Sequence, residues 1–347
     1  MRASSVVRGR ASGRRRARRV LPVLLLALSA SACGWMAAAQ TLPLDARASG
    51  WAAERRGLAG RDLNAVYFVD SKRGWAGGDG GLILHTDDGG RNWTQQTGFT
   101  DHSINDLYFR DKEDGYVLAA NRIFVTGDGG KSWRESSKFL PEGFGGALPE
   151  LYSVRFTSKR RGLIVGSVSR RDRVVDSLVL RTEDGGASWI RQAVPTREEL
   201  IHLDFASEKR GWIVGASGVM LETRDGGATW ARRDTQTGAT LYHVDFRSER
   251  NGWAVGERGT ILRTTDGGAT WAAVNAPLRA TLLSVQFISE DEGWIVGRGG
   301  VILRSDDGGL TWLRQESRTK QNLYALFMDK KNGWAVGGDG MVLQYAR

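Results

Sequence analysis

The sequence has few of the residues that build covalent cross-links or catalytic centres. Cys33 is the only cysteine among 347 residues, so no disulfide can form within the chain. No GxSxG or HExxH run is present, which disfavours hydrolase chemistry of those kinds. The 3.6-residue apolar period of helical repeats is also absent. An apolar run at residues 20–32, VLPVLLLALSASA, is too short for a stable membrane span.

Positive charge is concentrated at the N-terminus. Residues 1–20 hold eight arginines and no acidic residue, and the apolar run follows directly. This order is typical of a secretory signal peptide, which we assign to residues 1–39 with cleavage after Ala39. The pair Arg18/Arg19 leaves both Sec and twin-arginine export open. Without the eight arginines the formal net charge falls from +10 to +2, so nucleic-acid binding loses its main support.

Cys33 offers a second processing site. It directly follows the apolar run in the sequence ASAC, as the lipidated cysteine of a lipoprotein does. The leader would then be residues 1–32, and the lipid on Cys33 would hold the protein at a membrane. Both alternatives stay open, and both predict an exported protein, either periplasmic or membrane-anchored.

One short phrase, TxDxGxxW or its Ser variant, recurs six times and identifies a repeat protein. Successive Asp residues of the phrase are 40, 56, 41, 41 and 41 positions apart. The copies begin at Thr86, Thr126, Thr182, Thr223, Thr264 and Ser305.

A second marker, Gly followed by an apolar or aromatic residue, occurs seven times and so counts seven units. Residues 241–271 show one unit, with four short segments rich in β-branched and aromatic residues between turn residues. Units of roughly 40 residues with four strands each are typical of propeller blades. We therefore predict an all-β fold over residues 51–347, a seven-bladed β-propeller of four-stranded antiparallel blades.

The two ends of this region predict how the ring closes. The seventh unit stops after three strands, at MVLQYAR. The segment from Trp51 aligns with the segment from Trp230, which puts Trp51 at the Trp position of the phrase. The N-terminal segment is thus predicted to complete the last blade as its fourth strand. A closed ring has no open edge for pairing with another chain, so we expect a monomer.

The phrase itself is interpreted as a turn between the third and fourth strands. Its Asp can accept backbone N–H groups of its own loop, its Gly supplies a positive φ, and its Trp anchors the loop. Burying one indole stabilises the fold by at most about 4–6 kcal/mol. Calcium or ligand binding by the Asp residues is the alternative, and we expect neither a metal nor a cofactor.

The copies TTDGGATW, TRDGGATW and SDDGGLTW resemble the Asp boxes, or BNR repeats, of sialidases and sortilin-type propellers. The whole unit, with GWAVG before ILRTTDGG, is similar to the Ycf48-like photosystem II assembly and stability factors. This resemblance implies a non-enzymatic assembly factor that engages a nascent photosystem II subunit through an arginine-rich surface. Candidate counterparts of that surface are Arg155, Arg160, Arg161, Arg181 and Arg197.

A carbohydrate-binding or sialidase-like propeller is the alternative function. An acidic pair beside an aromatic platform in the central pocket would favour it. The inner strands offer only Tyr67, Tyr108 and Asp106 for this purpose, and the Arg-Ile-Pro signature of sialidases is absent.

Polar residues of the innermost strands form a candidate site in the channel. Aligning the first strands places two HxD pairs in adjacent blades, His202/Asp204 and His243/Asp245. They could converge on a metal, but we favour the interpretation that they satisfy one another beside water.

Two insertions predict the partner-binding site. Strand connections alternate between the two faces of a propeller, and both insertions belong to the face opposite the Asp boxes. They are the blade junction SSKFLPEGFGGALPE and the loop SVSRRDRVVDS of the third blade. Apolar residues flanked by arginine suit a protein interface, whereas a solvated hairpin is the competing interpretation. The residues that we expect to bind a protein partner are Phe139, Leu140, Phe144, Arg170, Arg171 and Arg173.

Overall fold

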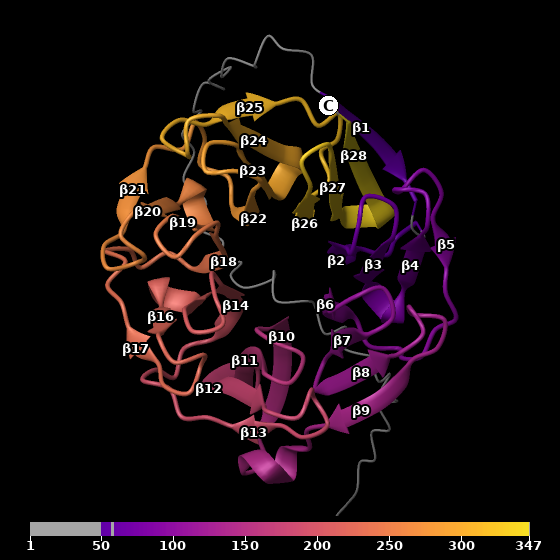
Figure 1. Ribbon diagram of the computed structural model, residues 1–347, viewed down its shortest axis with the longest axis vertical. Coiled ribbons are helices and arrows are strands. Elements are labelled where there is room, and N and C mark those ends of the chain that lie inside the picture. The colour runs from indigo at the N-terminus through magenta and orange to yellow at the C-terminus, as the bar shows by residue number, and fades with distance from the viewer. Residues whose placement is uncertain (1–49, 57–58, 347) are drawn as a thin grey trace, which may run out of the picture. The chain divides into compact units, whose positions relative to one another are not determined.

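The computed structural model describes residues 50–56 and 59–346, which form seven four-stranded antiparallel sheets arranged as blades around a ring (Figure 1). The predicted seven-bladed β-propeller is confirmed. In six blades the strands run in chain order from the channel to the rim, and in the seventh the outermost strand is β1 from the N-terminal segment. The leader and Cys33 lie outside the described residues. No helix within the described part of the chain is long and apolar enough to cross a membrane.

The strands of the first four blades follow one another along the chain. Blade one contains β2 (Leu63–Phe68), β3 (Gly74–Gly78), β4 (Ile83–Thr86) and β5 (Thr94–Gln95). Blade two contains β6 (Ile104–Phe109), β7 (Gly115–Ala119), β8 (Arg122–Thr126) and β9 (Arg134–Lys138). Blade three contains β10 (Leu148–Phe156), β11 (Gly162–Arg170), β12 (Arg173–Thr182) and β13 (Ile190–Arg191). Blade four contains β14 (Leu200–Phe205), β15 (Gly211–Gly215), β16 (Met220–Thr223) and β17 (Ala231–Arg232).

The last three blades repeat the pattern. Blade five contains β18 (Leu241–Phe246), β19 (Gly252–Gly256), β20 (Ile261–Thr264) and β21 (Ala272–Val274). Blade six contains β22 (Leu282–Phe287), β23 (Gly293–Gly297), β24 (Val301–Ser305) and β25 (Leu313–Gln315). Blade seven contains β26 (Leu323–Met328), β27 (Asn332–Gly337), β28 (Met341–Ala346) and β1 (Trp51–Arg55). Short 3₁₀ turns are η1 (Asp79–Gly81), η2 (Pro141–Phe144), η3 (Ala216–Gly218), η4 (Glu257–Gly259), η5 (Arg298–Gly300) and η6 (Gly338–Gly340).

The seventh blade joins the two ends of the described chain. β1 pairs antiparallel with β28, and Trp51 lies opposite Tyr345 in the register. This pairing fits the predicted closure of the ring. The Trp51 ring also packs edge-on against Trp294 of blade six, with ring centroids 5.9 Å apart.

Aromatic side chains hold neighbouring blades together. At four of the seven blade junctions, a Phe at the end of an inner strand stacks on the second-strand Trp of the preceding blade, as Phe287 does on Trp253 at 3.4 Å between centroids. The same Phe meets the Asp-box Trp of its own blade edge-on, Trp312 in this case. Trp253 is fully buried. At these four junctions the Phe ring is thus held between the two Trp side chains that mark the repeat, and this contact aligns the two neighbouring blades.

The Asp boxes are turns, as predicted. In blade five, Asp266 Oδ1 accepts the Thr270 N–H at 3.0 Å, and Oδ2 accepts the Thr270 hydroxyl at 2.6 Å. Gly268 has the positive φ of 77° that its place in the phrase requires. Because its carboxylate is already bonded within the loop, hydrogen bonds lower the pKa of Asp266 to about 2.

Candidate functional site

The propeller has two faces of different character. On one face each Asp-box loop is bonded to the first loop of its own blade, as the Gly267 N–H is to the Arg250 carbonyl at 2.8 Å. We call this the Asp-box face. The opposite face carries the turns between second and third strands and the junctions between blades, and we call it the elaborated face.

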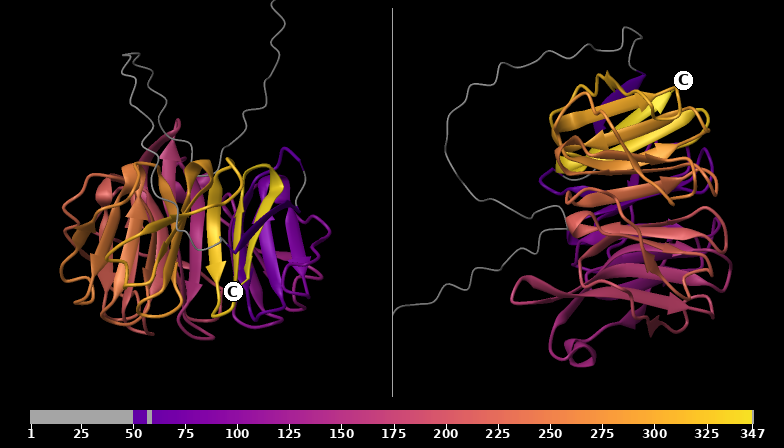
Figure 2. Two further views of the ribbon diagram at one scale, coloured as in Figure 1. Left: turned by 90° about the horizontal axis from the view of Figure 1, so that it is seen from above. Right: turned by 90° about the vertical axis from the view of Figure 1, so that its left-hand side faces the viewer.

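Both insertions lie together on the elaborated face at blade three. The junction between β9 and β10 contains η2, and the loop of blade three is an extension of β11 and β12 into a long hairpin. Arg170 Nη2 donates a hydrogen bond to the Gly145 carbonyl at 2.6 Å, which ties the hairpin to the junction. The hairpin rises above the neighbouring blades in Figure 2. We name residues 139–150 and 168–176 together the blade-three lobe.

The lobe has an anchored part and an exposed part. Phe139 and Phe144 are partly buried and pack against the core cluster shared by blades two and three. Leu140 beside them is 51% exposed. The binding site predicted from the sequence therefore contains both buried structural residues and exposed surface residues. The sequence alone does not show whether an apolar side chain in a loop faces the core or the solvent.

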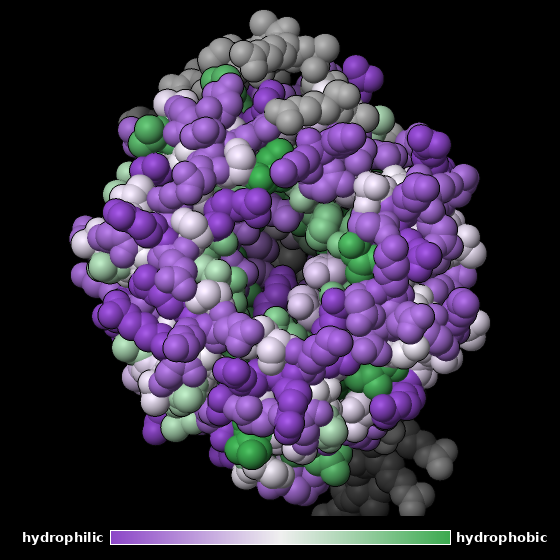
Figure 3. All heavy atoms as spheres, in the orientation of Figure 1, coloured by the Kyte–Doolittle hydropathy of each residue, from purple (hydrophilic) through white to green (hydrophobic). Residues whose placement is uncertain are grey.

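Large apolar side chains are exposed mainly in this part of the molecule. Six such side chains are exposed in the described chain, and four belong to blade three or to the junction before it. Figure 3 shows hydrophobic surface at the rim over η2 and β13, among hydrophilic residues. Clustered exposure of this kind marks interaction surfaces more often than scattered single residues do. Three of the four, Leu140, Leu148 and Val175, lie in the lobe, whereas Ile190 pairs with Arg181 near the Asp-box end of blade three.

Sequence reasoning missed several members of this surface. Leu148 begins β10 and is 61% exposed, and Val175 on β12 is 43% exposed. Arg191 binds Asp176 at 2.7 Å, and its guanidinium lies 5.2 Å from the Phe144 ring centre. The unusual length of the blade-three hairpin was a usable signal for Val175. No sequence signal indicated Arg191, because only the folded blade brings β13 next to the lobe.

The arginines at the hairpin tip differ in their contacts. Arg170 and Arg173 are directly opposite each other in the β11–β12 register. The Arg170 side chain is bonded to the Gly145 carbonyl, whereas the side chains of Arg171 and Arg173 form no hydrogen bond or ion pair within the described residues. Two unpaired cations therefore stand at the tip, in side chains that are exposed.

The channel residues form a connected polar wall. Arg155 on β10 binds Asp106 on β6 at 2.8 Å and donates to His202 Nε2 at 3.1 Å. The rings of His202 and His243 stack with their centres 3.7 Å apart. Burial lowers the pKa of His243 to about 3 and that of His202 well below its ordinary value, so both rings are neutral near pH 7.

The two channel aspartates join successive blades. Asp204 Oδ2 accepts the Phe246 N–H at 2.7 Å, and Asp245 Oδ2 accepts the Phe287 N–H at 2.9 Å. Each carboxyl group thus accepts a hydrogen bond from a backbone N–H group at the inner strand edge of the next blade, which otherwise has no strand to pair with. Burial, and then the neighbouring Asp204, raise the pKa of Asp245 to about 8. Within the described residues no group of three His, Cys, Asp or Glu side chains could hold a metal ion.

The arginines singled out by the family resemblance do not form one patch. Arg155 lies in the channel wall, and Arg197 is exposed in the junction before blade four on the elaborated face. The remaining three, Arg160, Arg161 and Arg181, lie at the Asp-box face, where each contacts a glutamate residue of the same or the next blade. The expectation that these five arginines form a single surface is therefore wrong for this chain.

A carboxyl pair is present on the elaborated face. The Tyr152 hydroxyl donates to Glu150 Oε2 at 3.2 Å, Glu199 lies on its other side, and burial raises the pKa of both carboxyl groups. Tyr152 is only 7% exposed and Glu199 only 8%. The ring therefore presents no open face on which a sugar could stack.

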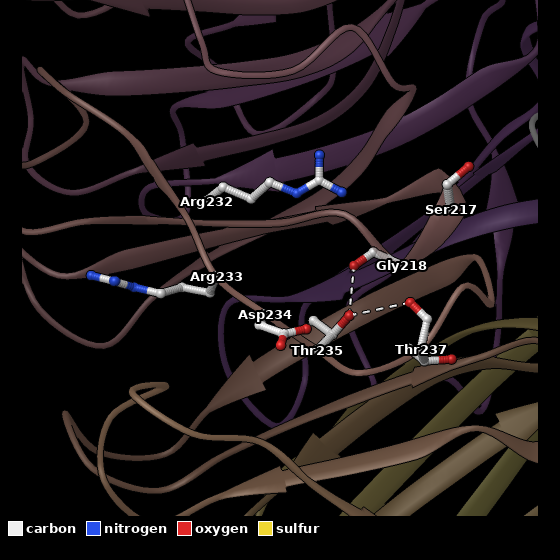
Figure 4. A pocket seen from close by; sticks show the side chains of 7 residues that line it. All are labelled: Ser217, Gly218, Arg232, Arg233, Asp234, Thr235 and Thr237. Carbon is white, nitrogen blue, oxygen red and sulfur yellow. Dashed lines mark hydrogen bonds between the residues drawn. The ribbon is translucent and has the colours of Figure 1, made fainter.

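A rim pocket of about 390 Å³ between blades four and five does not supply a sugar site either (Figure 4). Its lining includes one carboxylate and no aromatic ring. The Thr235 hydroxyl donates a hydrogen bond to the Gly218 carbonyl at 2.8 Å, so its proton is used within the protein. The lining residues are Ser217, Gly218, Arg232, Arg233, Asp234, Thr235 and Thr237.

Comparison with known proteins agrees with the repeat pattern. The sequence model of the photosynthesis system II assembly factor YCF48 matches three overlapping stretches, residues 183–240, 234–321 and 282–346. No curated protein matches the sequence.

Solved structures with the same fold include both binding proteins and enzymes. YCF48 bound to a D1 peptide matches with a TM-score of 0.72 and 21% identity, over 90% of this chain and 100% of that one. YCF48 from Cyanidioschyzon merolae matches with a TM-score of 0.68 and 20% identity, over 85% and 98%. A catalytically inactive virginiamycin B lyase from Staphylococcus aureus matches with a TM-score of 0.67 and 13% identity, over 86% and 99%. The structural matches show the fold, and the family model, which matches residues 183–346, confirms the predicted resemblance to the Ycf48-like family.

Proposed function

We propose that this Ycf48-like chain is an exported, non-enzymatic assembly factor that binds another protein of the envelope or membrane through the blade-three lobe. The observation that carries the proposal is the concentration of exposed apolar side chains on an extension that the ring does not need. Interfaces combine such apolar residues with arginine, and the lobe carries both.

Two further observations support a protein partner over a small molecule. The matching family is one of assembly factors, and a structural neighbour binds a D1 peptide. The buried carboxyl pair and the rim pocket both lack an accessible aromatic platform. In a photosynthetic host the partner would be a nascent photosystem II subunit.

Export is the second part of the proposal. The arginine-rich leader with its apolar run supports it, and Cys33 offers an anchor if it is lipidated. Labelling with a palmitate analogue separates the two routes, because only the lipoprotein route leaves label on the mature protein.

Charge reversal of the hairpin tip tests the binding site. We expect Arg170→Glu, Arg171→Glu and Arg173→Glu, combined, to abolish co-purification of the membrane partner, because the substitutions oppose the charge that it must match. The readout is affinity purification from membranes with mass spectrometry, together with binding of the D1 peptide.

A matched triple variant controls for the change in net charge. Arg232, Arg247 and Arg258 are exposed arginines of blades four and five, away from the lobe. Replacing them with glutamate is expected to leave the partner bound. Equal capture by both triple variants would contradict the proposed site.

A further inference from the structure

The turn at the tip of the blade-three hairpin is unlike the other turns at this position. Arg171 and Asp172 both have positive φ, 52° and 62°. They are the only two consecutive residues in the described chain that are both left-handed and both not glycine. A two-residue turn of this kind strongly favours Asn-Gly or Asp-Gly, because L side chains are strained there.

Blade five shows the relaxed alternative. Its turn between the second and third strands places Arg258 and then Gly259 in the left-handed region, with φ values of 55° and 76°. The turns of blades one, four, six and seven also have glycine at the second of these positions, namely Gly81, Gly218, Gly300 and Gly340. Five of the other six blades therefore have glycine at the second left-handed position, and the turn of blade two has a single left-handed residue, Ala120 with a φ of 51°.

Besides the strained turn, the tip has a second locally unfavourable feature, the repulsion between like charges. Arg170 and Arg173 are paired across the ladder, and like charges directly opposite each other destabilise a hairpin. Arg171 between them is exposed, and its side chain forms no hydrogen bond or ion pair within the described residues. Exposed apolar residues flank this charge, since Leu148 pairs with Ser169, next to Arg170, and Val175 lies two residues after Arg173. Local conflicts that a fold retains are found mostly at functional sites.

We propose that the hairpin tip is the recognition element of the lobe and that it binds a protein segment in which carboxylate side chains alternate with apolar ones. The proposal rests on the proposed function. Charge complementarity specifies the partner, because the exposed guanidinium groups of Arg171 and Arg173 can each donate two parallel hydrogen bonds to a carboxylate. Leu148 and Val175 supply the apolar contact beside them.

Replacing Arg171 with glycine tests the proposal without risk of unfolding. The probe is a labelled short peptide of alternating leucine and glutamate, followed by fluorescence anisotropy with the full mature chain. We expect Arg171→Gly to bind at least about tenfold more weakly, the loss typical of an interface arginine. Its Tm should stay equal or rise by about 1–3 °C, because glycine relieves the strained turn.

Arg258→Gly is the matched control, since it makes the same substitution at a left-handed turn position of blade five. It should bind the peptide like the unchanged protein, and a leucine–lysine peptide should bind to neither. Equal binding by Arg171→Gly, equal losses in both variants, or binding of phosphatidylglycerol vesicles in place of the acidic peptide would overturn the proposal. If the charge-reversed triple variant loses its membrane partner but the unchanged protein ignores the acidic peptide, the proposed function stands and this inference fails.

Discussion

Blade three and blade five follow one four-strand plan and differ where their strands reach the elaborated face. In blade five, β19 and β20 contain five and four residues and are joined by a turn with glycine at its second left-handed position. In blade three, β11 and β12 contain nine and ten residues, and their turn has no glycine. The ring needs only the shorter form, so the additional length of blade three serves something other than closure.

The two blades also differ in how they contact the next blade. Trp253 of blade five stacks on Phe287 of blade six, whereas blade three has Leu163 at the corresponding position. Blade three instead packs Phe139 and Phe144 of the junction against the core cluster that it shares with blade two. The regular blades thus bury their aromatic side chains between blades, whereas blade three also exposes the apolar side chains of Leu148 and Val175.

The largest effect on stability is expected from the regular part. Trp253→Ala removes a fully buried indole and its hydrogen bond to the Gly308 carbonyl, 3.0 Å away. We expect the free energy of unfolding to fall by about 3–5 kcal/mol. Urea unfolding followed by circular dichroism measures this, and the lobe provides the control. Leu140→Ala should change the stability by no more than about 0.5 kcal/mol, and similar losses in both variants would remove the distinction between ring and lobe.

A smaller effect is expected from the channel. Asp245 has a folded-state pKa raised to about 8, so its contribution to stability is full below the ordinary Asp pKa and is lost as the pH rises through 8. Asp245→Asn keeps an acceptor for the Phe287 N–H but cannot ionise. The variant should therefore be more stable than the unchanged protein at pH 9, by about 1–3 kcal/mol after allowance for channel water.

Unfolding at pH 5 and pH 9 provides the comparison for this variant. Arg171→Gly is the control, because it changes an exposed residue of the hairpin tip and leaves Asp245 in place, so it should show the pH dependence of the unchanged protein. An Asp245→Asn protein with the same pH dependence as the unchanged protein would show that the carboxyl group is ionised in the folded state.

Much of the ring could be predicted because each blade is specified locally. The phrase fixes a turn through Thr264, Asp266 and Gly268, and the following Trp271 is buried as expected. Because every copy of the repeat folds into the same blade, the number of repeats predicts the number of blades. The hydrogen bonds by which channel aspartates join successive blades could not be predicted from the sequence, because Asp204 and the Phe246 N–H that it binds are 42 residues apart.

The site was predictable only as a region. The lengths of two insertions placed the lobe on the correct face, because strand connections alternate between faces. Which side chains stay exposed depends on packing between blades, and this made Phe144 a structural residue and Leu148 a surface one. The dispersal of Arg155, Arg161 and Arg197 likewise follows from the ring, which sends neighbouring segments of one blade to opposite faces.

Site-specific cross-linking tests the central claim most directly, that the lobe and not the regular ring binds the partner. A photoreactive benzoylphenylalanine replaces Leu140 on the lobe or Leu310 in the Asp box of blade six, two leucines that are 51% and 59% exposed. Neither site is buried, so both proteins should fold with nearly unchanged stability. After irradiation of membranes, we expect a discrete adduct with one membrane protein from position 140 and none from position 310. An adduct from position 310 alone, or the same adduct from both, would contradict the account.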